Sequence, residues 1–335
     1  MKRNENDKKW PLVSVLIASK DRRPDLERAL ESVHNLDYPK GRMEVVVVEE
    51  TDQPSVPKGV NYFSIPRKNL GFGYARNQCV KHARYPLLAF TDDDCLLDRN
   101  WLKELVLALD EKAGGVAGAV EVKNRSGIGF CESILGFPGG GLKRVWHAQG
   151  KSVPTNQLST CNCLFRKEVV EKVGLFQENT HFSGEDYDLA QRVVRQFPCY
   201  YNPKAIVYHR PRGSFKTIFQ WFVRRGRGEI NLLFLKTHSL AWQLFYVFYT
   251  SFTLRLLILM VALSWVGIAP TVTAFFFFLA YYVLNLTRSF FQFKLGGTLA
   301  TWFLTPLVKA TMDLGWDAGK AVGFFNLLFK KEKQR

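Results

Sequence analysis

The stretch Phe90-Thr91-Asp92-Asp93-Asp94 decides how this sequence is organised, because three adjacent carboxylates directly follow a short apolar segment. Residues 87–90 predict a buried strand, and a helical pattern begins at Trp101. Clustered carboxylates at a strand end repel one another and lose hydration, which a bound divalent cation would offset. The alternative is a solvated acidic turn that caps the next helix, since aspartate is a good N-cap residue. The triplet alone leaves both interpretations open.

Apolar segments and helical patterns alternate on both sides of the triplet. The expected elements are strands over 13–18, 44–48, 60–65 and 87–90 and helices over 24–34, 74–84 and 101–109. This alternation predicts an α/β domain with a mostly parallel sheet. Ligands of such sheets bind outside the carboxyl ends of the strands. Asp21, Glu49 and the triplet all lie just past strand ends, so we expect them to converge on one site.

The next hundred residues add a second acidic site. Residues 123–158 are rich in glycine and predict a long loop or flap. The expected elements after it are a strand over 159–165, helices over 167–173 and 184–196, and a strand over 205–208 that ends at His209. Glu185 and Asp186 open the second helix, where acidic residues are favourable for the helix dipole.

The composition changes near residue 210. Residues 212–238 are basic and aromatic, which predicts an interfacial helix on a membrane; a basic nucleic-acid helix is the alternative. Two apolar segments at 244–266 and 271–287 predict membrane spans, with both ends of this hairpin cytoplasmic by the positive-inside rule. Residues 298–329 predict an amphipathic helix, with Lys309, Asp313, Asp317 and Lys320 on one face. A third span there is the alternative.

Bulk composition limits the possible classes of protein. The chain has 335 residues, 47% of them hydrophobic, and a formal net charge of +16, which indicates a globular protein with an anionic partner such as phosphate, lipid or nucleic acid. The six cysteines have no paired zinc-ligand spacing, and the close pair Cys161 and Cys163 is typical of structural residues, so reduced thiols are expected. Met1–Lys9 has no apolar segment of the kind found in signal peptides.

Residues 12–210 resemble the family-2 glycosyltransferases, which are inverting enzymes with the GT-A fold. The matching segments include VSVLIA from Val13, EVVVVEETD from Glu44, KNLGFGYARN from Lys68 and LLAFTDDDCL from Leu87. Further segments are STCNCLFRKEVVEKVGLF from Ser159, GEDYDLAQRV from Gly184 and NPKAIVYH from Asn202. The resemblance implies a GT-A catalytic domain over 1–211, with a nucleotide-sugar half (12–110) and an acceptor half (111–211), followed by the basic helix and a membrane region over 239–335.

The resemblance also implies roles for individual residues. Asp92 and Asp94 match the metal-binding DxD motif for Mn²⁺ or Mg²⁺, and His209 stands where some members have a third ligand, although a structural histidine is the alternative. Asp186 corresponds to the general base and Glu185 to its positioning partner. The donor-binding positions are Ser19, Asp21, Glu49, Gly71, Arg76, Asp92 and Asp93.

Residues 220–225 (QWFVRR) are similar to the QxxRW motif of processive synthases without matching it, so single addition is expected. Arg224, Arg225 and Arg227 are candidates for contact with acceptor phosphates or with anionic lipid. The sequence therefore predicts a membrane-anchored, metal-dependent transferase of glycan biosynthesis, with a cytoplasmic catalytic domain and an amphiphilic acceptor. A processive polysaccharide synthase and a non-catalytic sugar-nucleotide binder are the alternatives, and nucleic acid is not an expected partner.

Overall fold

The computed structural model describes residues 10–39, 41–178, 183–236 and 239–332. The charged residues Met1–Lys9 and the last residues of the basic C-terminal tail lie outside the described residues. The chain divides into two units. The first comprises residues up to Lys123 together with Gly136–His181 and Glu185–Arg210, and the second comprises Asn124–Leu135, Phe182–Gly184 and Pro211–Arg335. Each unit is described by itself.

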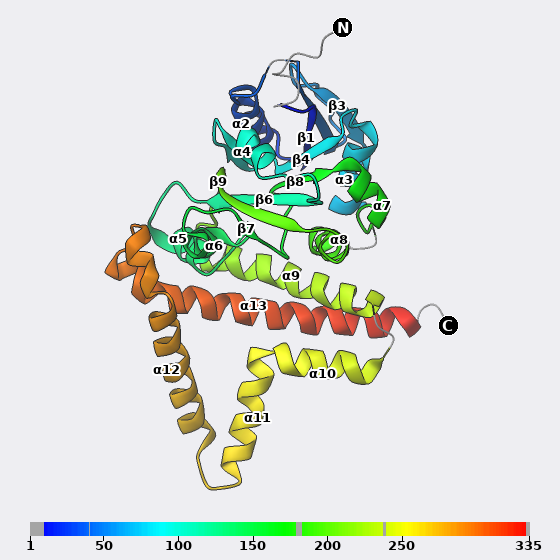
Figure 1. Cartoon of the computed structure of the whole chain (residues 1–335). Helices are drawn as coiled ribbons and strands as arrows, with labels where there is room; N and C mark the ends of the chain where they lie inside the picture. Colours follow the sequence, from blue (N-terminus) through cyan, green and yellow to red (C-terminus); the bar gives the residue numbers. More distant parts are fainter. Residues whose placement is uncertain (1–9, 40, 179–182, 237–238, 333–335) are drawn as a thin grey trace. The chain divides into compact units, whose positions relative to one another are not determined.

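One mixed sheet runs through the first unit (Figure 1). Within the described residues its order is β3-β2-β1-β4-β8-β6-β9-β5, and β7 pairs with β9. The six strands β1–β4, β6 and β9 run in one direction, whereas β5, β7 and β8 run in the other, so the expected α/β fold with a mostly parallel sheet is confirmed. The strands are β1 (Val13–Lys20), β2 (Met43–Glu50), β3 (Asn61–Ile65), β4 (Leu87–Asp92), β5 (Cys95–Leu97), β6 (Gly115–Glu121), β7 (Val153–Pro154), β8 (Asn162–Arg166) and β9 (Cys199–His209).

Helices cover both faces of this sheet. Alternate residues of β1 enter different apolar clusters: Leu16 packs with α3 (Phe72–His82), and Ile17 packs with α2 (Arg23–His34) and α4 (Trp101–Leu107). Burial on both faces explains why the strand sequences are continuous apolar segments rather than alternating ones. The remaining helices of this unit are α6 (Gly141–Ala148), α7 (Lys167–Val173) and α8 (Glu185–Val194).

The predicted loop over 123–158 is wrong, because this segment contains α5 (Gly127–Ile134), α6 and β7. Phe130 and Ile134 of α5 are buried at helical spacing, but the frequent glycines lower helix propensity and hide this signal. Helix α5 also belongs to the second unit rather than to the acceptor half, because Glu132 pairs with Arg212 at 2.6 Å and Cys131 contacts the carbonyl of Thr301.

Asn162 joins three strands beneath the carboxyl ends of the sheet. Its side-chain amide donates to the carbonyls of Ala119 (2.7 Å) and Ala205 (2.8 Å), where the register of β6 and β9 shifts, and its oxygen accepts the Trp101 indole N–H at 2.7 Å. Asn162→Ala leaves all three groups buried without these bonds. We expect the free energy of unfolding to fall by roughly 2–4 kcal/mol, measured by thermal unfolding. A fall of less than about 0.5 kcal/mol would contradict this account.

Glu44 is a buried carboxylate whose ionisation stabilises the first unit. Burial raises its pKa, but bonds from the Ser14 hydroxyl (2.6 Å) and from the backbone and side chain of Arg84 (2.7 Å each) outweigh burial, so its pKa is lowered. A lowered pKa gives stability that is present above the ordinary value of 4.5 and is lost as pH falls through the folded-state value. The Tm difference between the wild type and Glu44→Gln should therefore be largest at neutral pH and shrink below pH 4.5. A difference independent of pH would contradict this.

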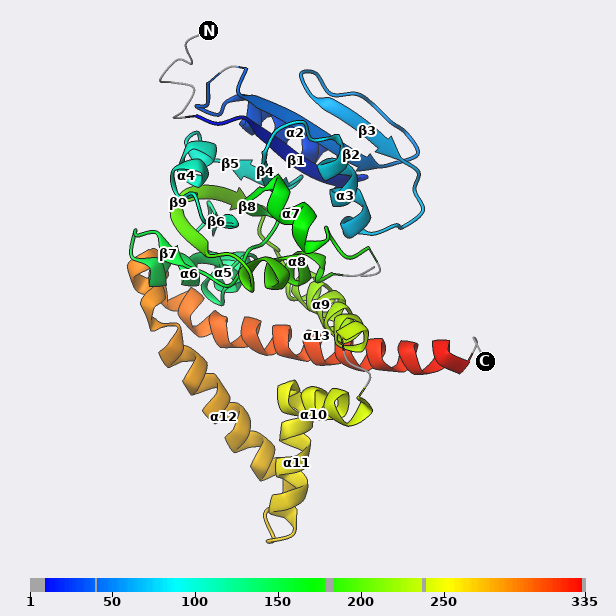
Figure 2. The same ribbon diagram turned by 45° about the vertical axis from the view of Figure 1, so that its right-hand side comes forward.

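Helices α9 (Phe215–Lys236) and α13 (Leu299–Glu332) lie side by side in the second unit (Figures 1 and 2). Glycines allow this close approach: a Cβ at Gly226 would lie 2.2 Å from the Trp316 carbonyl oxygen, and one at Gly319 would lie 2.2 Å from that of Val223. The sequence predicted both helices, over 212–238 and 298–329.

The predicted span over 244–266 is not one helix. It is divided into α10 (Leu240–Thr250) and α11 (Phe252–Ser264), which meet at 84°. Ser251 has extended backbone (ψ 123°), and its hydroxyl accepts the Leu254 N–H at 3.1 Å, so it caps a new helix. Asp317 reinforces the break by accepting from both the N–H (2.7 Å) and the hydroxyl (2.9 Å) of Thr253.

Helix α12 (Pro270–Arg288) coincides with the second predicted span. Among the described residues it is the one helix that is long and apolar enough to cross a membrane, and the bent α10–α11 pair would be a second span if counted as one. The polar face of α13 packs against these helices: Asp313 accepts the Tyr281 hydroxyl at 2.7 Å, and Lys320 donates to Thr250 at 2.8 Å. The structure thus offers one or two candidate membrane helices near the C-terminus.

Candidate active site

The carboxyl ends of β1, β2, β4 and β9 carry the polar residues singled out from the sequence. The strand register places Ser19 beside Glu49 and Ala18 beside Asp92, so these ends lie at one edge of the sheet. Asp93 and Asp94 follow β4, and His209 ends β9. Loops at this edge therefore bring together residues that are far apart in the sequence.

Asp93 and Asp94 are held by a neighbouring arginine and a serine. Asp93 is buried, accepts the Ser19 hydroxyl at 2.8 Å and pairs with Arg22 at 3.3 Å; Arg22 also pairs with Asp94 at 3.1 Å. Burial raises the pKa of Asp93 to about 7, although Arg22 acts in the opposite direction. Two of the predicted donor-site residues, Ser19 and Asp93, thus contact each other, and Arg22 supplies a compensating charge that the sequence did not indicate.

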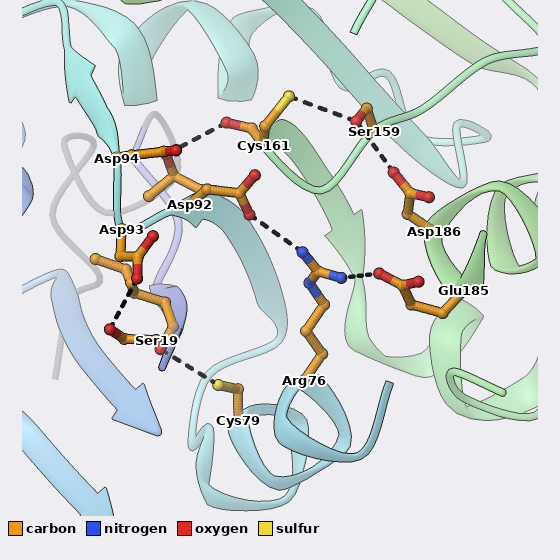
Figure 3. Close-up of polar contacts among 12 residues, drawn as sticks. Ser19, Arg76, Cys79, Asp92, Asp93, Asp94, Ser159, Cys161, Glu185 and Asp186 are labelled. Atoms are coloured by element: carbon orange, nitrogen blue, oxygen red, sulfur yellow. Dashed lines mark hydrogen bonds and ion pairs between the residues drawn. The ribbon is translucent and has the colours of Figure 1, made fainter. Parts of the chain in front are cut away.

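Arg76 lies between the two acidic sites (Figure 3). Its guanidinium pairs with Asp92 at 3.1 Å and forms a second, closer ion pair with Glu185. Although burial alone would lower it, the carboxylates of Glu185 and Asp92 raise the pKa of this arginine, so it stays charged. Burial in turn raises the pKa of both carboxyl groups, with Arg76 opposing the shift. Arg76, which the sequence predicted as a donor-binding residue, is therefore a buried bridge between the two acidic sites.

Asp186 is the half-buried neighbour of Glu185 at the start of α8. Its Oδ2 accepts the Ser159 hydroxyl at 3.1 Å, and its Oδ1 accepts the Tyr187 N–H at 2.8 Å. Ser159 also contacts the Cys161 thiol at 3.4 Å (Figure 3). A carboxylate held by two donors at a helix N-terminus is oriented and remains able to accept a proton.

Asp94, Cys95 and His209 form the one group of potential metal ligands found in the described part of the chain, with one ligand atom of each within 4.8 Å of the others. Nε2 of His209 lies 3.4 Å from Oδ1 of Asp94. A carboxylate oxygen and an imidazole nitrogen at this spacing fit a divalent cation such as Mn²⁺. Asp92 is not in this group, and one of its oxygens pairs with Arg76 at 3.1 Å. The sequence predicted two of these three residues and missed Cys95.

The remaining donor-site residues border the same edge of the sheet. Glu49 is buried and accepts the Tyr62 hydroxyl at 2.7 Å, whereas Asp21 has a left-handed backbone (φ 51°) and pairs with Arg67 at 2.9 Å. Gly71 begins α3 with φ 88°, a conformation that favours glycine. A cavity of about 90 Å³ opens beside Ser19, Glu50 and Gly71.

Arg224, Arg225 and Arg227 lie on α9 in the second unit. Arg224 is exposed, whereas the guanidinium of Arg225 stacks on Trp221 (4.8 Å to the ring centroid) and faces Trp316 (5.6 Å). Arg225 therefore has a packing role within its own unit, and Arg224 is the most accessible of the three.

Sequence reasoning missed Arg22 and Ser159 as well as Cys95. Arg22 directly precedes a helix, and Ser159 lies three residues before a strand. At neither position does a local sequence pattern distinguish a site residue from an ordinary loop residue. Cys95 directly follows the acidic triplet, and only the pairing of β5 with β9 brings it to His209.

Comparison with known proteins agrees with this geometry. Residues 14–174 match the model described as Glycosyl transferase family 2. These residues form a glycosyltransferase family 2 domain. The chain is 27% identical over 277 residues to "Probable glycosyltransferase YdaM" of Bacillus subtilis, covering 74% of this chain but only 64% of that protein. It is also 27% identical over 240 residues to glycosyltransferase AglE of Haloferax volcanii, covering 69% of this chain and 77% of that protein.

A similar fold is found in a solved structure. The mannosyltransferase PcManGT of Pyrobaculum calidifontis, in complex with GDP-Man and Mn²⁺, superposes with a TM-score of 0.58 at 18% identity, covering 89% of this chain and 86% of that one. This likeness supports the GT-A fold that the resemblance implied.

Proposed function

We propose that this chain transfers a sugar from a nucleotide-diphosphate sugar to an acceptor hydroxyl, with inversion at the anomeric carbon and one addition per acceptor. The observation that carries the proposal is the Arg76 bridge. It holds Asp92, from the nucleotide-sugar half, and Glu185, from the acceptor half, on one guanidinium. Inverting transfer needs an acidic donor site and a base on the acceptor side within one site.

Asp186 is the proposed general base. The acceptor oxygen forms the new bond to the anomeric carbon while its proton passes to Asp186, and the bond to the diphosphate breaks, releasing the nucleotide diphosphate. Ser159 and the Tyr187 N–H hold the carboxylate in place during this step. Glu185 is anchored by Arg76 and positions the start of α8, and with it the base.

Asp92, Asp94 and His209 are the residues that would hold a divalent cation, Mn²⁺ or Mg²⁺. When bound, such an ion neutralises negative charge on the departing diphosphate. A protein of the same fold was solved with GDP-Man and Mn²⁺, which is in keeping with this assignment. Ser19, Asp21, Glu49, Gly71 and Asp93 are the proposed nucleotide contacts at the same edge of the sheet.

A lipid-linked acceptor and a membrane location with the catalytic unit in the cytoplasm complete the proposal. Helix α12 and the exposed aromatic residues of α10, such as Trp242 and Phe245, support membrane contact. The exposed cation of Arg224 is suitable for binding a phosphate of the acceptor or of a lipid.

A donor-hydrolysis screen tests the function. The purified full chain is incubated with UDP, GDP and dTDP sugars in the presence of Mn²⁺ or Mg²⁺, and release of the nucleotide diphosphate is measured. We expect turnover with one nucleotide class, and its loss on adding a chelator. Silence with every donor, both with and without lipid extracts as acceptor, would overturn the proposal.

A further inference from the structure

Cys95 and His209 are cross-strand partners. Cys95 is the first residue of β5 and faces His209, the last residue of β9, in an antiparallel pair. Directly opposed residues of such a pair have their side chains on the same face of the sheet. Asp94 immediately precedes Cys95, and the Arg210 N–H donates to its carbonyl at 3.2 Å, which holds the two strand ends together.

His209 and Asp94 each have one polar atom bonded elsewhere, which leaves the other atom to face Cys95. Nδ1 of His209 donates to the carbonyl of Arg210 at 2.8 Å, which leaves the lone pair of Nε2 available. Arg22 pairs with Oδ2 of Asp94 at 3.1 Å. The other oxygen, Oδ1, lies 3.4 Å from Nε2 of His209. An oxygen, a nitrogen and the Cys95 sulfur, each held in place, therefore converge within 4.8 Å.

We propose that Cys95 is a direct ligand of the cation held by Asp94 and His209, so that this site prefers thiophilic divalent ions such as Zn²⁺ and Co²⁺ over Mg²⁺. Coordination replaces the S–H bond with a sulfur–metal bond and releases the proton to solvent. Thiolate and imidazole donors favour these ions, whereas carboxylate and water suit Mg²⁺. This inference adds a ligand to the metal site of the proposed function, and its test is independent of catalysis.

Cobalt spectroscopy of the full chain reports the ligand directly. We expect one equivalent of Co²⁺ to produce a sulfur-to-cobalt charge-transfer band in the near ultraviolet. Cys95→Ser should abolish the band. Cys199→Ser is the matched control, because Cys199 is buried at the other end of β9, and it should keep the band. Zn²⁺ affinity of Cys95→Ser should fall by roughly tenfold or more, with a smaller change for Mn²⁺.

Several results would overturn the inference: cobalt bound without the band in the wild type, no cobalt bound at all, or a band that persists in Cys95→Ser. If the variant does not fold, absence of the band from the wild type still overturns the inference. A chain that shows the band but transfers no sugar would contradict the proposed function and leave this inference standing. A chain that transfers sugar but shows no band would support the proposed function and contradict this inference.

Discussion

Asp186→Asn is expected to lower kcat by a factor of about 10²–10⁴, because the amide cannot accept the proton of the acceptor hydroxyl. Asparagine keeps the shape of the side chain and can still bond to Ser159, so the start of α8 should remain in place. Affinity for the donor should change by less than about threefold, since the proposed donor contacts lie at the ends of β1, β2 and β4. Steady-state kinetics and calorimetric titration with the donor measure the two quantities.

Asp188→Asn is the matched control on the same helix. Asp188 pairs with Arg192 at 2.9 Å within α8 and is assigned no part in the reaction. Its replacement should lower Tm and leave kcat close to the wild-type value. If Asp186→Asn kept wild-type turnover, or lost donor binding together with turnover, Asp186 would not be the base.

Arg76→Met is expected to lower the free energy of unfolding by about 3–5 kcal/mol and to abolish transfer. The change leaves Asp92 and Glu185 without their shared cation, and an uncompensated buried carboxylate is costly. Methionine fills much of the volume of the arginine stem, so the loss reports charge rather than a cavity. Thermal unfolding followed by circular dichroism measures the effect.

Two further variants test whether that loss of stability comes from the buried ion pairs of Arg76. Arg28→Met removes the exposed partner of Asp25 on α2 and should cost less than about 0.5 kcal/mol. The double variant Arg76→Met with Glu185→Gln should be more stable than Arg76→Met alone by roughly 0.5–3 kcal/mol, because one unpaired charge is gone. Purely additive effects would show that Arg76 and Glu185 are not coupled.

Local patterns in the sequence predicted most of the first unit. Buried parallel strands such as β1 and β2 are continuous apolar segments, and α7 matches its expected bounds, because each signal lies within the element itself. Strand β5 has three residues and exists only through its pairing with β9, and β6 is interrupted by glycines. Such elements depend on tertiary pairing that no window of sequence contains.

The same distinction applies to the site. Asp92, Asp94, Glu185 and Asp186 lie at strand ends or at a helix start, positions with a local pattern. The structure joins two of them, Asp92 and Glu185, through Arg76. The position of Arg76 on α3 was predicted, but its burial between two carboxylates was not, since that depends on α8 returning to the sheet edge. Cys95, Arg22 and Ser159 act through partners from distant segments, so their contacts could not be predicted from the sequence.

In the proposed membrane location, the break at Ser251 limits how deep the α11–α12 hairpin can extend into a bilayer. The 13 residues of α11 measure about 20 Å along the helix axis, whereas the 19 residues of α12 measure about 28 Å. A hydrocarbon core is roughly 30 Å thick, so α11 covers about two thirds of it when it enters along the bilayer normal. The exposed turn that begins at Trp265 then stops within the distant leaflet, and a water-soluble reagent added on that side would not reach it.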